Sequence, residues 1–120
     1  MDLRDLFGNA EDGKVFKAGT TIFTEGTLGD VMYVVLDGEV EVRVGGKVIE
    51  VMKPGDFFGE MVLIDFSPRS ATALAKSDCR LVAIDEKRFV ETVYETPFFA
   101  VHVMRVLASR LRRMDANLNA

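Results

Sequence analysis

A glutamate and an arginine nine positions apart carry the clearest chemistry in this sequence. Glu60 directly follows Gly59 and precedes a short apolar run, while Arg69 directly follows Pro68. A guanidinium can donate two parallel hydrogen bonds to phosphate oxygens, and a carboxylate can accept hydrogen bonds from a sugar hydroxyl. A phosphorylated ribose offers both partners. The pair therefore predicts a binding site for a ligand of that kind.

The backbone around these two side chains is expected to contribute to the same site. Residues 55–72 are predicted to form a strand, a tight turn, a short helix and a second strand. Gly59 lets the backbone approach a ligand closely, and amides at the start of the short helix, within residues 59–63, are expected to face a phosphate. Three or four charge-assisted hydrogen bonds of about 1.5–3 kcal/mol each would support a micromolar complex of about −8 kcal/mol.

The elements that must position this site are predicted to form a small, mainly β domain. Between residues 15 and 84, short β-branched and aromatic runs alternate with glycines, a spacing typical of an all-β roll or sandwich. Residues 40–44 alternate valine with charged side chains. Gly45 and Gly46 then predict a tight hairpin before the next apolar run.

Helices are expected at both ends of this β-region. Asp2 can cap a short helix within the first seven residues, Asp85 can cap another, and Pro97 suits the first turn of a third. The helical part is expected to span about residues 85–118 of a single domain, 1–120. The last predicted helix carries an apolar stripe at heptad spacing, which consists of Met104, Leu107, Leu111, Met114 and Leu118. Two alternatives are open for this stripe: a homodimer partner, or the chain's own β-region.

Charge and hydropathy exclude several classes of protein. The net charge is −4, which divides into about −7 for residues 1–97 and +3 for residues 98–120. An acidic body argues against a broad nucleic-acid surface, and the arginines of the last helix are expected to complement its dipole. No secretory signal is expected after Met1, and the apolar run 31–36 is far too short to span a bilayer. We therefore expect a cytoplasmic protein with no membrane partner.

A catalytic role is not expected. His102 is the only histidine and falls outside the β-region, so the imidazole-rich metal site of cupins, another class of small β-rolls, cannot be assembled. No serine, cysteine or lysine has a visible histidine partner for nucleophilic catalysis. Cys79 is the only cysteine, excludes an internal disulfide and is expected to be buried. We expect no catalytic residue, no metal and no cofactor.

Residues 57–72 closely resemble the phosphate-binding cassette of cyclic-nucleotide-binding domains, as in catabolite-activator regulators, cyclic-nucleotide-dependent kinases and gated channels. The matching positions are Phe58, Gly59, Glu60, a hydrophobic pair, Leu63, and then Pro68, Arg69, Ser70, Ala71 and Thr72. The resemblance extends upstream through Gly19, Glu25, Gly26, Gly29, Asp30, Tyr33 and Gly38. It implies a mainly β fold with flanking helices: an eight-stranded, jelly-roll-like β-roll with an N-terminal helix and C-terminal helices. We refer to residues 57–72 as the cassette.

The resemblance also implies a ligand, cAMP or cGMP, and a role for individual positions. Glu60 would bind the ribose 2′-hydroxyl, Arg69 would bind the cyclic phosphate, and nearby backbone amides would donate to phosphate oxygens. Ser70 permits either nucleotide, whereas Val62 replaces the smaller alanine usual in the family and would crowd the pocket. The residues expected to contact the ligand are Phe58, Gly59, Glu60, Met61, Val62, Arg69, Ser70 and Ala71.

Different uses of such binding stay open at this point. The chain can be a regulatory sensor that signals through its C-terminal helix to an unidentified effector protein, the sensor fragment of a transcription regulator, or an orphan interaction scaffold that has lost its nucleotide. Transcription regulators of the family continue into a DNA-binding helix-turn-helix after the long helix. The sequence ends at Ala120, soon after that helix, so direct DNA binding is not expected.

Plainer interpretations of single residues are also open. Glu60 and Arg69 can form an exposed ion pair that contributes about 0–1 kcal/mol to stability. The aromatic residues Phe57, Phe58 and Phe66 are expected to lie in the core or in the pocket wall.

Overall fold

The computed structural model describes the backbone of residues 1–119 and the side chains of residues 1–114. The chain forms two compact units, Asp2–Glu86 and Lys87–Ala120, the latter together with Met1. The side chain of Leu118, the last residue of the predicted apolar stripe, lies outside the described residues. Within the described part of the chain, none of the helices has the length and apolar character needed to cross a membrane.

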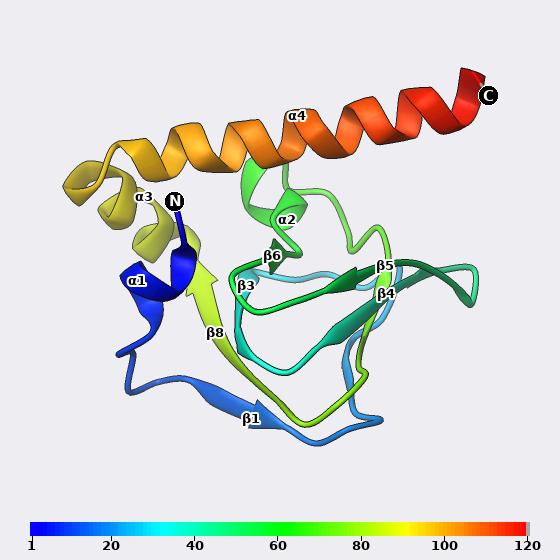
Figure 1. Cartoon of the computed structure of the whole chain (residues 1–120), viewed down its shortest axis with the longest axis horizontal. Helices are drawn as coiled ribbons and strands as arrows, with labels where there is room; N and C mark the ends of the chain where they lie inside the picture. Colours follow the sequence, from blue (N-terminus) through cyan, green and yellow to red (C-terminus); the bar gives the residue numbers. More distant parts are fainter. Residues whose placement is uncertain (120) are drawn as a thin grey trace. The chain divides into compact units, whose positions relative to one another are not determined.

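The unit Asp2–Glu86 contains, in the described chain, eight strands in two four-stranded antiparallel sheets (Figure 1). The first sheet has the order β1 (Lys14–Phe16), β8 (Cys79–Asp85), β3 (Val31–Asp37), β6 (Phe57–Phe58). The second sheet has the order β2 (Thr21–Phe23), β7 (Thr72–Ala75), β4 (Val40–Val44), β5 (Lys47–Met52). The eight-stranded β-roll expected from the sequence is therefore confirmed.

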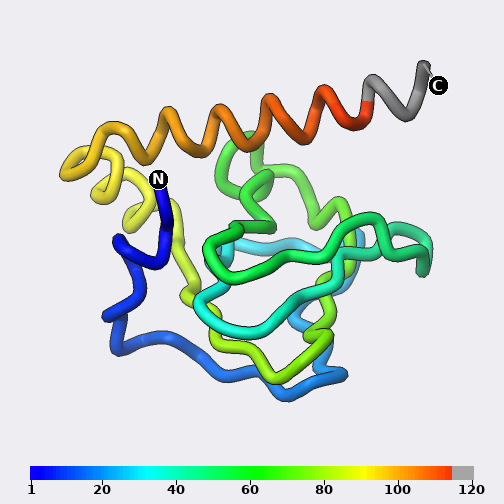
Figure 2. Tube along the Cα trace, viewed as in Figure 1, coloured from blue at the N-terminus to red at the C-terminus, as the bar shows by residue number. Residues whose placement is uncertain are grey.

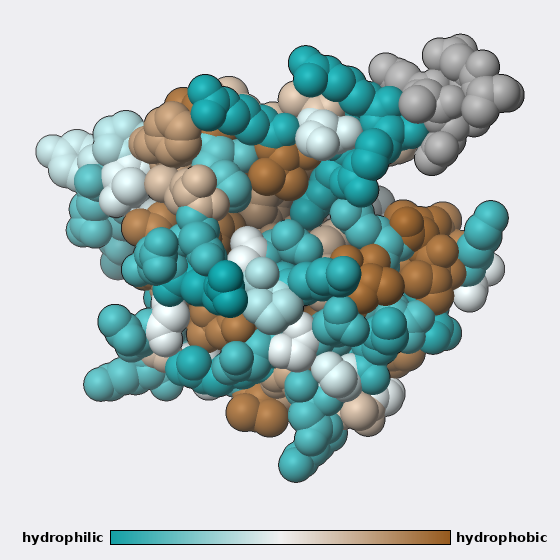
Figure 3. Space-filling view, in the orientation of Figure 1, coloured by the Kyte–Doolittle hydropathy of each residue, from teal (hydrophilic) through white to brown (hydrophobic). Residues whose placement is uncertain are grey.

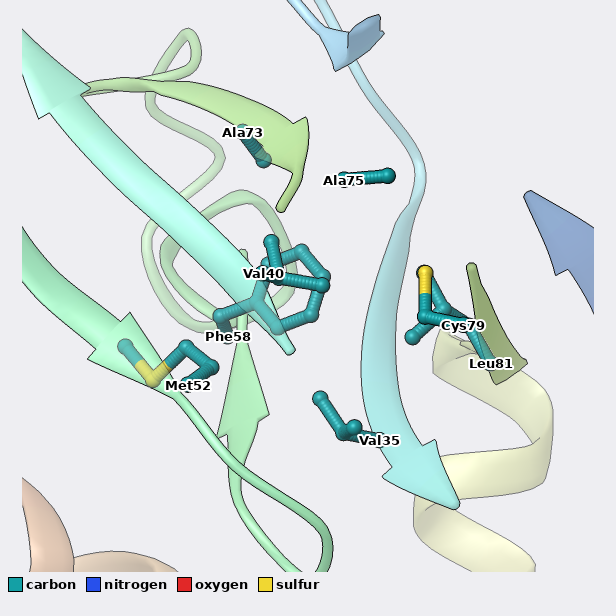
Figure 4. Close-up of a cluster of buried hydrophobic side chains, with 8 residues drawn as sticks. All are labelled: Val35, Val40, Met52, Phe58, Ala73, Ala75, Cys79 and Leu81. Carbon is teal, nitrogen blue, oxygen red and sulfur yellow. The ribbon is translucent and has the colours of Figure 1, made fainter. Parts of the chain in front are cut away.

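One hydrophobic cluster receives side chains from both sheets (Figure 4). Its buried members are Val35, Val40, Met52, Phe58, Ala73, Ala75, Cys79 and Leu81. Complete burial of a valine or leucine side chain contributes roughly 1.5–3 kcal/mol to folding, so this cluster is a main source of stability for the β-roll. Cys79 is buried, as predicted, and burial raises the pKa of its thiol.

The local elements predicted most directly are also present. Helix α1 (Leu3–Phe7) is capped by Asp2, whose carboxylate accepts a hydrogen bond of 2.9 Å from the Arg4 amide. Between β4 and β5, Gly45 and Gly46 have φ angles of 57° and 80°. A tight turn with two positive φ angles matches the twist of its strands, which explains the two glycines.

The outer half of the β4–β5 hairpin departs from a simple alternation of buried and exposed positions. Val44, Val48 and Ile49 are all exposed, although the inner hairpin residue Val40 is completely buried. Figure 3 shows hydrophobic side chains on the surface in this region. The hairpin extends beyond the second sheet's other strands, so its tip contributes little to the core.

The described residues 87–119 of the second unit are mainly helical, and Figure 2 traces them in colour up to residue 114. Helix α3 (Glu86–Glu95) starts directly after Asp85, as expected, and α4 (Phe98–Asn119) starts directly after Pro97, which therefore precedes the helix instead of lying in its first turn. The rings of Phe89 and Phe99 pack with their centroids 5.2 Å apart and link the two helices. On α4, the stripe residues Met104, Leu111 and Met114 each have an exposed fraction near 60%.

Candidate functional site

The cassette has the predicted order of strand, turn, short helix and strand. Strand β6 ends at Phe58, and Gly59 turns the chain with a φ of 76°, a conformation that favours glycine. Helix α2 (Met61–Ile64) follows, and β7 begins at Thr72. The amide of Leu63 donates to the Glu60 carbonyl at 2.9 Å. That amide belongs to the helix and does not face outward, although it was among those expected to face a phosphate.

A tight turn connects α2 to Pro68 and Arg69. The Ser67 amide donates to Oδ1 of Asp65 at 3.1 Å, and the side-chain and backbone hydrogen bonds from Ser67 lower the pKa of the Asp65 carboxyl. Phe66, in the middle of the turn, has a φ of 58° and is 73% exposed. Phe66 therefore does not lie in the core, because the turn leaves most of its side chain exposed.

The backbone of Arg69 is fixed by a loop from a distant part of the sequence. The Arg69 amide donates to the Thr27 carbonyl at 2.8 Å, and the Arg69 carbonyl accepts from the Gly26 amide at 2.8 Å. Three residues further along the chain, Oγ1 of Thr72 accepts a hydrogen bond from the Glu25 amide at 2.9 Å. The loop after β2 therefore runs beside the end of the cassette (Figure 2) and sets the position of Arg69.

The Arg69 side chain is buried, with an exposed fraction of 5%. Its Nη1 donates to the Gly59 carbonyl at 2.9 Å, and its Nη2 donates to the Val31 carbonyl at 2.7 Å. Its Nε is also buried and has no hydrogen-bond partner among the described residues. The guanidinium is therefore hydrogen-bonded to the cassette at Gly59 and to strand β3 at Val31, while its Nε–H stays unsatisfied.

Three uncharged groups enclose the same guanidinium. Its carbon Cζ lies 4.0 Å from the centroid of the Phe23 ring, within the range of a cation–π contact. A Cβ added to Gly29 would lie 2.5 Å from Nε and 2.6 Å from both Cζ and Nη2. A Cβ added to Gly59 would lie 2.6 Å from Nη1. Both glycines are required for space, since a side chain at either position would displace Arg69.

The electrostatics of the site reflect the burial of opposite charges. Burial lowers the pKa of the Arg69 guanidinium, and the nearby groups Asp30 and Glu60 act in the opposite direction. Glu60 has an exposed fraction of only 6%. The alternative of an exposed ion pair is therefore wrong for both residues. A buried cation beside buried or nearby carboxylates can bind an anion that also carries hydroxyl groups.

The remaining predicted contact residues divide by exposure. Phe58, Val62 and Ala71 are buried, Met61 and Ser70 are exposed, and Gly59 is half-buried. Phe57 and Phe58 lie in the core, as predicted. The Val62 side chain, 4% exposed, packs into the protein, so its additional methyl groups are accommodated within the fold.

The supports of Arg69 were not predicted from the sequence. Gly29 was expected only as part of the family resemblance, and Phe23 was not singled out. The sequence does not indicate that the carbonyls of Val31 and Thr27 take part, because every residue has a backbone carbonyl. The signals that could have indicated the first two are an aromatic residue at the end of β2 and a glycine in the loop that follows it.

Among the described residues, no group of three or more histidine, cysteine, aspartate or glutamate side chains is arranged to hold a metal ion. The buried side chains of Arg69 and Glu60 and the surrounding backbone offer hydrogen bonding and charge.

Two four-stranded sheets that share a hydrophobic cluster, with a cassette in which an arginine and a glutamate are buried, define a β-roll domain. The family described as "Cyclic nucleotide-binding domain" matches residues 13–95, which include all the strands named above. The chain belongs to this family.

Individual relatives agree with this assignment. The CRP-like cAMP-activated global transcriptional regulator of Mycobacterium tuberculosis is 33% identical over 108 residues, which are 86% of this chain and 48% of the regulator. The crystal structure of Thermus thermophilus catabolite activator protein matches with a TM-score of 0.81 at 34% identity, over 89% of this chain and 53% of that chain. A structure from work on a cyclic-GMP-dependent signalling pathway that regulates bacterial phytopathogenesis has a TM-score of 0.77 at 30% identity, and covers 94% of this chain and 95% of that one. The chain spans about half the length of the Mycobacterium tuberculosis regulator and of the cyclic AMP receptor protein of Thermus thermophilus.

Proposed function

We propose that this chain is a regulatory sensor domain that binds cAMP, and cGMP more weakly, at one site per chain, and that it catalyses no reaction. The observation that carries the proposal is the buried guanidinium of Arg69, held by the carbonyls of Gly59 and Val31 inside the cassette. Folding has already removed this cation from water, so a bound anion meets it without a further large desolvation cost.

The donor inventory of Arg69 suits a cyclic phosphate. A guanidinium has five N–H groups, and two of them are used by carbonyls. The Nε–H is buried and has no partner among the described residues, and an unsatisfied buried donor costs about 1–3 kcal/mol. An oxygen of a cyclic phosphodiester would satisfy such a donor and neutralise the charge. The phosphate is therefore the part of the ligand assigned to Arg69.

The second anchor in the proposal is Glu60 at the start of α2. Its carboxylate is buried near Arg69, and the turn at Gly59 separates it from the core strand β6. A carboxylate at this place would accept a hydrogen bond from the ribose 2′-hydroxyl. Because noncyclic phosphates carry a second negative charge and a different shape, we expect the site to prefer the cyclic nucleotide over 5′-AMP.

Isothermal titration calorimetry with cAMP, cGMP and 5′-AMP tests the proposal. We expect one site per chain, micromolar affinity for cAMP, weaker affinity for cGMP and little heat with 5′-AMP. The matched control variant is Arg80→Ala, which removes an arginine that donates to the Ala10 carbonyl at 2.8 Å outside the cassette and should keep nucleotide binding. No heat and no thermal shift with either cyclic nucleotide at millimolar concentration would favour an orphan interaction scaffold instead.

The signal is proposed to leave through α4. Its exposed stripe, represented by Met104, Leu111 and Met114, suits a second copy of the chain or an effector helix. If nucleotide changes the position of α4, ligand binding and dimerisation must affect each other by the same factor. Hydrogen exchange of α4 and sedimentation velocity, each with and without cAMP, measure this coupling. Identical exchange and identical sedimentation would show that α4 is not the output element.

A further inference from the structure

The contact between Phe23 and Arg69 joins the cassette to an aromatic side chain that lies outside it. Phe23 is the last residue of β2, in the second sheet, and lies 46 positions before Arg69. Its ring centroid is 4.0 Å from Cζ of the guanidinium. At that distance the ring face is in direct contact with the cation, and a desolvated contact of this kind is among the stronger cation–π interactions.

The contact completes the restraint of the guanidinium. Hydrogen bonds from Nη1 and Nη2 to two carbonyls fix one part of the group within its own plane. They leave rotation about the axis through those bonds less restricted. The ring against the face restricts that rotation, and so does Gly29, where an added Cβ would lie 2.5–2.6 Å from Nε, Cζ and Nη2. The ring therefore determines where the remaining N–H groups point.

Phe23 can serve this purpose because its own position is fixed. Its ring stacks on Tyr33 at 6.2 Å between centroids with an interplanar angle of 25°, and contacts Phe58 at 5.8 Å. Its backbone is paired with Ala73 of β7, the strand that ends the cassette. The same pairing links Phe23 to the segment that carries Arg69, so ring and guanidinium share one rigid support.

We propose that Phe23 is a positioning residue for nucleotide binding, and that its ring holds the Arg69 guanidinium in the orientation that receives the phosphate. This inference rests on the function proposed above. It assigns part of the affinity to a side chain outside the cassette and in the other sheet from β6. The chemical requirement is an aromatic face, so tyrosine should replace Phe23 and an aliphatic residue of similar bulk should not.

The contact itself is tested without nucleotide, by a double-mutant cycle of urea unfolding with Phe23→Leu, Arg69→Ala and the double variant. We expect the two changes to be non-additive, with a coupling of about three- to thirtyfold in the unfolding equilibrium constant. If the changes in unfolding free energy of the two single variants add up to that of the double variant, Phe23 and Arg69 do not interact and the inference is wrong. This cycle keeps its meaning even if the protein binds no cyclic nucleotide.

The role in binding is tested by titrating cAMP into Phe23→Leu and Phe23→Tyr. We expect Phe23→Leu to weaken binding by about three- to thirtyfold and Phe23→Tyr to stay within about twofold of the unchanged protein. The matched control is Phe16→Leu. Phe16 also packs on Tyr33 in the same aromatic cluster, but the cation over its ring is Nζ of Lys14, 5.3 Å from the ring centroid, and not Arg69. If Phe23→Leu is unfolded by circular dichroism, Phe23→Met takes its place with the same expected loss.

The outcomes separate the two proposals. Absence of cAMP and cGMP binding in the unchanged protein would refute the proposed function alone. Binding by the unchanged protein together with equal affinity in Phe23→Leu, or an equal loss in Phe16→Leu, would overturn the positioning role of Phe23.

Discussion

Replacement of Gly29 by alanine is a sharp test of how Arg69 is held. The added Cβ would lie 2.5–2.6 Å from three atoms of the guanidinium, a separation at which either the side chain or the loop must move. Gly29 does not have a positive φ, so its backbone conformation suits alanine and the effect is one of space. Arg69 is the group with freedom to move, because it is the end of a long side chain. Any movement breaks its bonds to the carbonyls of Gly59 and Val31.

The magnitude follows from those contacts. Overpacking of this kind costs about 1–3 kcal/mol of stability. Loss of one charge-assisted hydrogen bond to the phosphate would remove about 1.5–3 kcal/mol from binding, which corresponds to roughly a ten- to hundredfold loss of affinity. Urea unfolding measures the first quantity and calorimetric titration with cAMP measures the second.

The chain offers a matched control at Gly13. A Cβ there would lie 2.8 Å from Nε and Nη2 of Arg80, so Gly13→Ala also presses on a guanidinium, but one that bonds the Ala10 carbonyl. We expect Gly13→Ala to lower stability and to leave cAMP affinity unchanged. Wild-type affinity in Gly29→Ala, or an equal loss of affinity in Gly13→Ala, would refute the reasoning.

Three further predictions concern other parts of the molecule. Arg69→Ala should lower cAMP affinity more than Glu60→Ala, because the phosphate is charged in every state and would be left beside a lost cation; titration of both variants checks the order. The side-chain hydrogen bond from Arg4 lowers the pKa of Asp2 from 3.8 to about 2, so the stability that this carboxylate provides is present above pH 3.8 and is lost as the pH falls toward 2. The difference in unfolding free energy between the unchanged protein and Asp2→Asn should therefore shrink across that window in urea titrations. Leu111→Lys places a charge in the exposed stripe of α4, and sedimentation velocity should then detect no dimer.

The parts of the fold that the sequence predicted correctly depend on near neighbours in the chain. The cap at Asp2 and the Gly45–Gly46 turn each require residues only a few positions apart, and both are present. The order of strand, turn, helix and strand in the cassette is equally local. Burial of Cys79 follows from its position in a central strand and its apolar character.

The parts that could not be predicted depend on pairing across long stretches of sequence. β1 pairs with β8 and β2 pairs with β7, and no local pattern specifies those partners. The exposed side chain of Phe66 depends on a turn conformation that is unusual for a bulky residue, so its hydrophobicity gave the wrong expectation. Composition likewise could not show that the tip of the β4–β5 hairpin lies outside the core.

The cassette illustrates how these two kinds of information combine at the site. In the proposed function its residue types supply the chemistry, a cation for the phosphate and a carboxylate for the ribose, whereas the contacts of the Arg69 guanidinium come in part from Val31 and Phe23, which belong to other strands. These supports hold the guanidinium dehydrated and oriented before any ligand arrives, and preorganisation of this kind raises affinity because the ordering cost belongs to folding. Two family members with identical cassettes can therefore differ in affinity when their supports differ. A comparison of cAMP affinity among chains that keep Glu60 and Arg69 should follow the residue at the position of Phe23 more closely than exposed cassette positions such as Ser70.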